Sequence, residues 1–418
     1  MRFLIYSKYG EGAGLGLRLE QEGNTVGLYI KEREYRTVYD GILDKVGIRD
    51  IDDETIIVFD SSGMGSEADK LKRSGHKVFG AGKFQDKLEN DREFGLEFMQ
   101  EHGIEIPASR KFESTSDGLD FIVDNRGDYI FKPSGDLPSK LTYKPCDPDD
   151  LAHYMEFVDK NYDIESFILQ ECIEGTALST EFFCGKWGFV EPATHTIEIK
   201  KFMNDNLGPS TGCSANTIWE AERNDIVDKL KKIEDDILDQ GYIGPIDLNV
   251  MVVDDQFYGL EWTPRFGLDA MPTWLQLTDE DVGQTISDLI DGSVGKICLR
   301  SGFASGVRVS IPPFPIEPHN LKVIEREQPN YGVPIRGFED NESKVYLYEV
   351  LKSDGVLYHS AGTGAIGVVS DVADTIASSF NEPYRILEKA KIPDKQYRTD
   401  AAKVIGGMHK KVKEMVYA

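Results

Sequence analysis

The stretch that decides the fold is Gly244-Pro-Ile-Asp-Leu-Asn-Val250, followed shortly by Gly259-Leu-Glu-Trp-Thr-Pro-Arg-Phe-Gly267. Both halves have the composition of β-strands, and the polar residues between them predict a hairpin turn. Each strand carries one carboxylate, Asp247 and Glu261, and carboxylates on adjacent antiparallel strands can point to the same face. Two such oxygen ligands suit Mg²⁺, which completes its shell with phosphate oxygens and water. The pair therefore predicts a magnesium site, near which Arg265 could hold an anionic group.

The composition indicates a large enzyme with several domains. The 418 residues suffice for two or three domains with ample cores. A formal net charge of −26 argues against nucleic-acid binding, because a polyanion would be repelled from most faces. The cysteines form no Cys-x-x-Cys pair, which is typical of reduced cytoplasmic residues. No apolar run reaches the ~18 residues of a membrane span. We expect a cytoplasmic protein without a signal peptide or membrane partner, either monomeric or homodimeric.

The N-terminal residues alternate strand and helix patterns. Short apolar segments predict strands at residues 3–6, 26–30, 55–59 and 77–79. Such a series predicts an open parallel sheet, whose ligands bind beyond the carboxyl ends of the strands. The glycine-rich residues 10–16 follow the first strand. As a dinucleotide fingerprint this loop is weak, because no well-placed acidic residue ends the second strand.

The rest of the chain predicts a mixture of helices and strands. Further strands are expected at residues 129–132, 167–170, 180–183, 187–190, 306–311, 344–349, 356–358 and 364–369. Helices are expected at residues 88–103, from about 151, at 224–240, at 371–380 and from 399 onward. His195 has no second His or Cys at ligand spacing, so we interpret it as a packed or solvent residue rather than a zinc ligand.

Three further segments carry residues suited to a nucleotide or another anion. Lys132 ends a strand before a Gly/Ser loop, where it could reach phosphates or be a surface lysine before a turn. Residues 170–175 leave a strand, so their backbone and Glu171 could read adenine, or the segment could be an ordinary strand exit. The small-residue loop 208–216 could approach an anion closely, or be a plain surface loop.

Each of these motifs is a modest signal alone, but their order along the chain is similar to that in a known family. Over most of its length the chain resembles the phosphoribosylamine–glycine ligases, ATP-grasp enzymes of purine synthesis. The segments similar to motifs of that family are the predicted helix 88–103, Gly208-Pro-Ser-Thr-Gly212, Glu261, Arg265-Phe-Gly267, Tyr358-His-Ser-Ala-Gly and Tyr397-Arg-Thr-Asp400. The order of cations, glycine-rich loop and carboxylates is also similar.

The resemblance implies an α/β ATP-grasp fold in three parts. Residues 1–87 would form an open parallel-sheet domain, residues 88–300 the ATP-grasp domain with a small lobe at about 108–180, and residues 301–418 an α+β domain. The implied activity is ATP-dependent ligation of a carboxylate, with glycine suspected, to an amine. The carboxylate would attack the γ-phosphate to give an acyl phosphate, and the amine would then expel phosphate. ATP and Mg²⁺, with Mn²⁺ as an alternative, are the implied cofactors.

The resemblance also implies roles for particular residues. Asp247 and Glu261 would hold the metal ion. The implied nucleotide contacts are Arg92, Lys132, Lys140, Glu171, Cys172, Ile173 and Glu181. The implied catalytic residues are Arg265, Lys200 and Gly212. Gly10, Gly12, Glu198, Ser210, Thr211 and Arg265 would bind the substrates.

The chain also departs from the family in ways that keep two alternatives open. Tyr9-Gly-Glu-Gly-Ala-Gly14 replaces the family's Gly-Gly-Arg-Glu-His-Ala, and Thr263 replaces the metal-site Asn. Glu11 stands where a sugar phosphate would prefer a neutral or basic neighbour. One alternative is an ATP-grasp ligase that joins glycine or another carboxylate to a different amine. The other, a non-catalytic nucleotide-binding homologue, is opposed by the retained carboxylates and cations.

Overall fold

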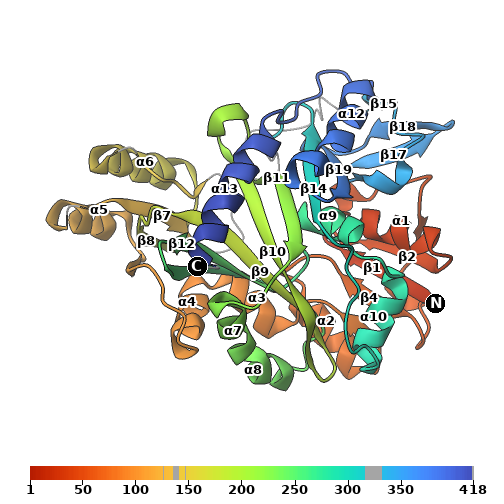
Figure 1. Cartoon of the computed structure of the whole chain (residues 1–418), viewed down its shortest axis with the longest axis horizontal. Coiled ribbons are helices and arrows are strands. Elements are labelled where there is room, and N and C mark those ends of the chain that lie inside the picture. The colour runs from red at the N-terminus through yellow and green to blue at the C-terminus, as the bar shows by residue number, and fades with distance from the viewer. Residues whose placement is uncertain (126, 135–140, 146, 316–331, 417–418) are drawn as a thin grey trace.

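The computed structural model describes residues 1–125, 127–134, 141–145, 147–315 and 332–416. Two large sheets and two three-stranded sheets organise them. Figure 1 shows the N-terminal sheet and a small lobe at opposite ends of the molecule, with the largest sheet between them. No helix among these residues is long and apolar enough to cross a membrane. Four cysteines lie within the described ranges, and all are free thiols: Cys172, Cys184, Cys213 and Cys298.

The N-terminal part is the open parallel sheet that the sequence predicts. Its strands are β1 (Arg2–Ser7), β2 (Thr25–Ile30), β3 (Asp44–Lys45), β4 (Ile56–Phe59) and β5 (Lys77–Phe79). They pair in parallel in the order β3-β2-β1-β4-β5. The helices are α1 (Ala13–Gln21), α2 (Gly65–Arg73) and α3 (Lys83–Asn90). The glycine-rich loop therefore lies at the carboxyl end of the central strand β1, where ligands of such sheets bind.

The small lobe carries a core of its own. Its strands β6 (Ser109–Phe112), β8 (Phe167–Glu171) and β7 (Tyr129–Pro133) pair antiparallel, with β8 in the centre. Helices α5 (Thr115–Asp124) and α6 (Pro148–Asn161) complete the lobe. Phe131 and Phe167 are almost fully buried between the lobe's sheet and helices. Because this core is separate from the main one, the lobe forms a distinct layer beside the central sheet (Figure 1).

The central sheet has eight strands in the order β13-β12-β9-β10-β11-β14-β19-β16. Their bounds are β9 (Thr176–Gly185), β10 (Gly188–Lys201), β11 (Ser210–Glu220), β12 (Gly244–Val253), β13 (Gln256–Thr263), β14 (Phe303–Ser310), β16 (Val345–Leu347) and β19 (Ala365–Ala373). β11 pairs with β14, so the sheet continues past residue 300 into the C-terminal part. The domain boundaries expected from the sequence stay predictions.

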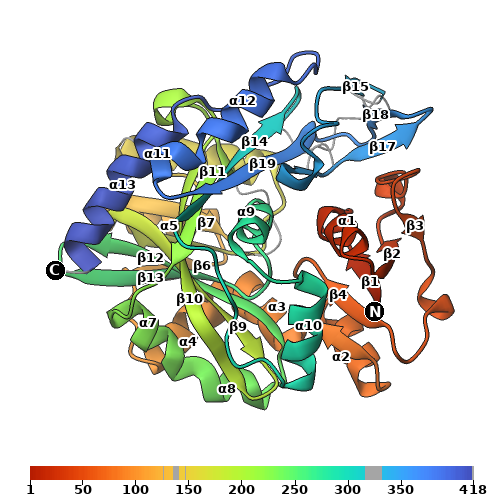
Figure 2. The same cartoon turned by 45° about the vertical axis from the view of Figure 1, so that its right-hand side comes forward.

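Helices cover both faces of this sheet. α13 (Ala401–Val416) packs across β9–β12 on one face. α9 (Ala270–Leu277) packs against β11, β14 and β19 on the other face, which Figure 2 shows as a helix between the N-terminal sheet and the central sheet. The buried His195 lies 2.9 Å from both Thr180 and Asn224. Burial lowers its pKa to about 4, so it is a packed residue, as expected.

The remaining elements are short or peripheral. A three-stranded sheet is formed by β15 (Pro334–Ile335), β17 (Val350–Ser353) and β18 (Val356–His359). The helices are α4 (Arg92–Glu101), α7 (Asp225–Leu230), α8 (Glu234–Asp239), α10 (Val282–Asp291), α11 (Ile376–Ser379) and α12 (Asn381–Lys389). Single 3₁₀ turns lie at η1 (Arg33–Tyr35), η2 (Ile48–Asp50), η4 (Asn204–Asn206), η5 (Lys231–Ile233) and η7 (Glu342–Lys344).

Three predicted helices have different bounds in the structure. The helix expected at residues 88–103 is divided between α3 and α4, because Asp91 caps α4 by accepting a hydrogen bond from Phe94 N. The helix expected at 224–240 is interrupted by the 3₁₀ turn η5. The helix expected from residue 371 begins only at Ile376, since Asp371 still pairs with Ser305 in the sheet. Thr375 then caps α11.

Candidate active site

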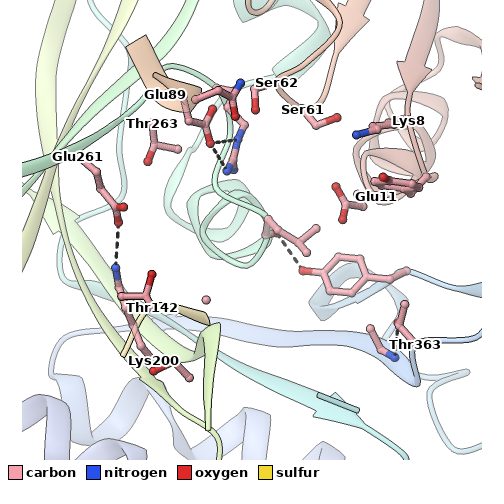
Figure 3. A pocket seen from close by; sticks show the side chains of 18 of the residues that line it. Lys8, Glu11, Ser61, Ser62, Glu89, Thr142, Lys200, Glu261, Thr263 and Thr363 are labelled. Atoms are coloured by element: carbon pink, nitrogen blue, oxygen red, sulfur yellow. Dashed lines mark hydrogen bonds and ion pairs between the residues drawn. The ribbon is translucent and has the colours of Figure 1, made fainter. Parts of the chain in front are cut away.

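A cavity of about 610 Å³ lies between the N-terminal sheet, the small lobe and the central sheet. Its lining comes from every part of the chain, including the loop after β1, the end of β7, the central strands and the segment after β18. In Figure 3, Lys200 and Glu261 lie on one side of the cavity, and Lys8, Glu11 and Thr363 lie on the other. The site is thus assembled by tertiary packing of distant segments.

The lining is positively charged although the chain is strongly acidic. Six lysine and arginine side chains face four glutamates, a formal excess of two positive charges within a chain of net charge −26. The cations are Lys8, Arg92, Lys132, Lys200, Arg265 and Arg308, and the glutamates are Glu11, Glu89, Glu261 and Glu349. Low-dielectric walls of one charge sign concentrate ligands of the opposite sign. The cavity therefore suits an anionic ligand.

Glu261 lies at the centre of the cationic end of the cavity. Its Oε1 is 3.2 Å from Lys200 Nζ, and its Oε2 is 3.7 Å from Arg92 Nη1. The neighbouring Lys200 holds the pKa of Glu261 well below its usual range, and Glu261 in turn raises the pKa of Lys200. The carboxylate is 38% exposed and lines the cavity. An ionised carboxylate is therefore presented to any ligand there.

Asp247 lies on the same face of the hairpin as Glu261. Asp247 pairs with Thr263, and Asn249 pairs with Glu261, so the two carboxylates are two positions apart along the ladder and point to the same face. This register confirms the predicted β12–β13 hairpin. Burial, together with the nearby carboxylates of Glu181 and Glu198, raises the pKa of Asp247.

The carboxylate pair fits a divalent cation. Asp247 Oδ1 is buried and has no hydrogen-bond partner among the described residues, so a metal ion would satisfy it. Within those same residues, no group of three His, Cys, Asp or Glu side chains is arranged as a metal site. Two protein carboxylates are nevertheless a sufficient protein contribution for Mg²⁺, which commonly takes its other ligands from phosphate and water. Asp247 is not itself part of the cavity lining.

Lys132 and Arg92 lie where the small lobe meets the cavity. Lys132 Nζ donates a 2.7 Å hydrogen bond to Gln170 Oε1, and burial lowers the pKa of Lys132 to about 8. Arg92 Nε donates a 2.9 Å hydrogen bond to the carbonyl of Pro133. Both side chains line the cavity beside Glu261. Two cations that the sequence places 40 residues apart thus converge on one carboxylate.

The segment expected to read adenine lies at the end of β8, outside the cavity lining. The N–H of Glu171 donates to the Ala108 carbonyl, and the N–H of Cys172 donates to the Asp128 carbonyl. No hydrogen-bond acceptor within the described ranges is paired with the N–H of Ile173. The Cys172 N–H is therefore already bonded within the protein, and adenine binding by this segment stays a prediction.

Two other expected nucleotide contacts have different outcomes. Lys140 lies outside the described residues. Glu181 lies on β9 directly opposite Asp247, and burial raises its pKa to about 8. It is not part of the cavity lining. The structure thus places Glu181 opposite Asp247 rather than at the cavity surface.

Arg265 lines the cavity and is paired with Glu89, a residue that was not predicted from the sequence. Arg265 Nε and Nη2 donate to Glu89 Oε1 at 3.2 and 2.7 Å, and Nη1 donates to the Phe266 carbonyl at 2.9 Å. Figure 3 shows Glu89 between Ser62 and Thr263. Glu89 lies in the last turn of α3, 176 residues before Arg265 in the sequence, so no local pattern indicates this pairing.

The start of β11 also borders the cavity, and the loop predicted at residues 208–216 is wrong from Ser210 onward, because these residues pair with β10 in the central sheet. Ser210 and Gly212 line the cavity, and Gly212 has φ +76 with no atom within 4 Å of the position that a Cβ would occupy. Thr211 instead bonds to the Lys200 carbonyl at 3.2 Å. Glu198 lies deeper in the sheet, where burial raises its pKa. Ser210, expected to bind substrate, and Gly212, expected to be catalytic, reach the cavity, whereas Thr211 and Glu198 are not among the residues that line it.

The C-terminal Tyr-Arg-Thr-Asp segment anchors the β10–β11 hairpin. Arg398 donates to both carboxylate oxygens of Asp400, at 2.8 and 2.7 Å. Its Nη1 donates to the Lys201 carbonyl at 3.0 Å and to Asn206 Oδ1 at 2.9 Å. Asp400 also accepts from the N–H of Asp205. Two hydrogen bonds from this buried guanidinium, to the Lys201 carbonyl and Asn206, and one to Asp400 from the Asp205 N–H therefore connect the C-terminal part to the β10–β11 hairpin.

The N-terminal glycine loop is held from within by Asp60, which the sequence did not single out. The N–H of Gly12 donates to Asp60 Oδ2 at 2.6 Å, and the N–H of Gly10 donates to Ser7 Oγ at 2.7 Å. Ser7 Oγ donates in turn to Asp60. Gly10 lines the cavity and Gly12 does not. Both N–H groups expected to contact a substrate are thus committed inside the protein.

The sheet order and the cavity between the N-terminal part, the small lobe and the central sheet define the class: this is the ATP-grasp fold. The biotin carboxylase domain of Hydrogenobacter thermophilus 2-oxoglutarate carboxylase, solved with MgADP, matches with a TM-score of 0.66 and 12% identity over 99% of this chain and 95% of that chain. The predicted fold class is confirmed.

Particular relatives carry the name predicted from the sequence motifs. The phosphoribosylamine–glycine ligase of Methanocella arvoryzae is 23% identical over 333 residues, covering 75% of this chain and 72% of the relative. That of Streptococcus pneumoniae is 22% identical over 346 residues, covering 79% of each. The crystal structure of the Thermotoga maritima ligase matches with a TM-score of 0.75 and 20% identity, over 96% of this chain and 100% of that chain. No family model matches the chain. These likenesses confirm the predicted resemblance.

Proposed function

We propose that the protein is an ATP-dependent carboxylate–amine ligase, with glycine as the carboxylate and phosphoribosylamine as the amine. The names of the relatives support the two substrates. The observation that carries the proposal is the convergence of Glu261, Lys200, Arg92 and Lys132 on one net-positive cavity. Phosphoryl transfer depends chiefly on positioning and charge neutralisation, and this arrangement supplies both.

In the proposed mechanism the protein first positions the triphosphate. Asp247 and Glu261 would hold Mg²⁺ or Mn²⁺, which when bound neutralises phosphate charge. Lys132 and Arg92 would contact phosphate oxygens from the small-lobe side. Lys200, which pairs with Glu261 in the structure, would contact the transferred phosphoryl group. The substrate carboxylate oxygen then attacks the γ-phosphorus, and the bond to the β-phosphate oxygen breaks.

The second half-reaction forms the C–N bond. Arg265 and the backbone of Ser210 and Gly212 would hold the acyl phosphate against the cavity wall. The amine nitrogen attacks the acyl carbon, the bond from carbon to the phosphate oxygen breaks, and the amine proton passes to solvent. Adenine binding by Glu171, Cys172 and Ile173, and the cytoplasmic, monomeric or homodimeric state, stay predictions from the sequence.

A second candidate for the amine has one observation in its favour. The donors of the N-terminal glycine loop are committed to Asp60 and Ser7, and Glu11 lines the cavity beside them. A helix N-terminus is a natural phosphate site only while its N–H groups are available. This observation favours an amine that lacks a phosphate group at this loop.

The proposal is tested by ADP release in the presence of ATP, Mg²⁺ and glycine. Phosphoribosylamine, generated in the assay, is compared with a panel of amines that carry no phosphate, and each product is identified by mass. The proposal predicts that ADP forms only when both glycine and an accepted amine are present. ADP release independent of glycine, or none with any amine, would contradict it.

Changing Glu11 to glutamine is expected to improve the use of phosphoribosylamine. Like charges about 4 Å apart near a protein surface repel by about 4 kcal/mol, so removing one should lower the KM for this amine by about tenfold or more. The KM for ATP should stay unchanged. Steady-state kinetics of wild type and variant check both values. An unchanged KM for phosphoribosylamine would mean that Glu11 does not face its phosphate.

Affinity for ATP is expected to fall as the pH rises through about 8. Burial lowers the pKa of Lys132 from its ordinary 10.5 to about 8, so the cation that contacts phosphate is lost above that pH. The unfolded chain holds this proton up to about pH 10.5, so Lys132 makes the ligand-free protein more stable to unfolding as the pH rises from 8 to 10.5.

Calorimetric titration of ATP between pH 6.5 and 9.5, about 1.5 pH units on either side of this pKa, checks the expected loss. In Lys132→Met the affinity should be lower at neutral pH, and its step near pH 8 should disappear. If the variant keeps the same step, another group is responsible for it.

A further inference from the structure

We propose that Arg308 binds the carboxylate of the amino-acid substrate and that Asp269 is the residue that orients it. This inference rests on the proposed function and deepens it, because it assigns the substrate's anionic group to a side chain outside the sequence motifs. Arg308 is on β14, and it lines the cavity. Asp269 immediately precedes α9.

The geometry of the pair fixes the guanidinium in one orientation. Arg308 Nε lies 2.7 Å from Asp269 Oδ2, and Nη2 lies 2.8 Å from Oδ1. The Arg308 side chain is 8% exposed and that of Asp269 is 1% exposed. The Tyr348 hydroxyl lies 2.8 Å from Asp269 Oδ1 and 2.9 Å from the Leu268 carbonyl. Asp269 therefore accepts hydrogen bonds from both Arg308 and Tyr348, which fixes the position of its carboxylate.

This arrangement leaves one edge of the guanidinium for a ligand. The pairing with Asp269 uses Nε and Nη2. No residue within the described ranges accepts from Nη1, and Nη1 is not among the buried atoms that lack a partner. It therefore keeps access to the solvent of the cavity that Arg308 lines. A planar guanidinium edge matches a carboxylate better than a lysine ammonium does.

Arg308 lies beside the hairpin that the mechanism places against the acyl group. The ring of Phe314 is 5.0 Å from the guanidinium carbon of Arg308 and 5.6 Å from the ring of Phe202. Phe202 N donates to the Pro209 carbonyl, closing the β10–β11 hairpin just before Ser210. Arg308, Ser210 and Gly212 all line the same cavity.

Arg265, the arginine expected from the sequence, has less capacity for a carboxylate. Each of its three nitrogens already donates to Glu89 or to the Phe266 carbonyl. Arg308 instead keeps both Nη1 protons available. The two arginines therefore have different roles. Arg308 binds the carboxylate of the incoming amino acid, and Arg265 contacts the phosphate group of the acyl phosphate.

The test is calorimetric binding of glycine to the full-length protein saturated with ADP and Mg²⁺. Arg308→Met should weaken glycine binding by about 10- to 100-fold, as expected for the loss of charge-assisted hydrogen bonds. ADP binding should change by less than about twofold. Arg308→Lys keeps the positive charge beside Asp269 and guards against misfolding of the methionine variant, and it should weaken glycine binding by about tenfold.

Arg300→Met is the matched control, because Arg300 also pairs with an aspartate, Asp279, but on the surface. It should bind glycine as wild type does. Wild-type glycine affinity in folded Arg308→Met or Arg308→Lys would overturn the inference, as would the absence of glycine binding by wild type. A wild type that binds glycine but releases no ADP with any amine would instead overturn the proposed function.

Discussion

Replacing Glu261 by glutamine will lower the rate of ADP formation by about 100-fold or more while leaving the fold intact. The substitution keeps the shape of the side chain but removes the charge that lies 3.2 Å from Lys200 and faces the cavity. A neutral amide is a poor magnesium ligand and no longer positions Lys200. Because both the metal site and the cation depend on this carboxylate, the loss should appear in kcat and not only in the KM for ATP.

Coupled-enzyme measurement of ADP release, at saturating ATP and Mg²⁺, checks this prediction. Glu220→Gln is a suitable control, because Glu220 is an exposed residue at the end of β11 in the same sheet. It should keep wild-type activity. Wild-type turnover in Glu261→Gln at saturating Mg²⁺ would show that the metal site lies elsewhere.

Replacing Arg398 by methionine will lower the free energy of unfolding by about 3–5 kcal/mol, the usual cost of leaving one partner of a buried ion pair alone. Arg398 is 1% exposed and donates to Asp400, the Lys201 carbonyl and Asn206. Its loss leaves these acceptors without their donor. It also frees the β10–β11 hairpin, so turnover should fall even where the protein remains folded.

Urea denaturation followed by circular dichroism measures the stability change. The control is Arg385→Met, because Arg385 pairs with Glu382 on the surface of α12, where such pairs contribute at most about 1 kcal/mol. A loss in Arg398→Met no larger than in this control would show that the C-terminal segment does not anchor the hairpin.

Local patterns explain how much of the fold the sequence could predict. The β12–β13 hairpin and the parallel strands of the N-terminal sheet depend on apolar runs and turns that neighbouring residues specify. The break at Asp91 was missed because an aspartate is compatible both with a continuous helix and with an N-cap. The late start of α11 was missed because Asp371 belongs to a strand through its pairing with β14. That tertiary pairing overrides local helix propensity.

In the candidate site, too, residues in local motifs could be predicted, whereas residues that depend on tertiary contacts could not. Glu261, Lys132 and Arg265 belong to motifs that can be recognised in order along the chain, and all three line the cavity. Asp60 and Arg308 could not be singled out, because their roles depend on partners 48 and 39 residues away in sequence, Gly12 and Asp269. Only tertiary packing brings such pairs together, and no periodic pattern in the sequence indicates them.

The central claim is that this cavity activates a carboxylate by transferring a phosphoryl group to it. The most direct measurement uses glycine whose carboxylate is labelled with heavy oxygen, together with ATP, Mg²⁺ and the amine that supports turnover. Because the labelled oxygen attacks the γ-phosphorus and leaves with it, each turnover should place one labelled oxygen in the inorganic phosphate. Mass spectrometry of the phosphate reads this out. Inorganic phosphate released at the rate of turnover, but without the label, would contradict the account.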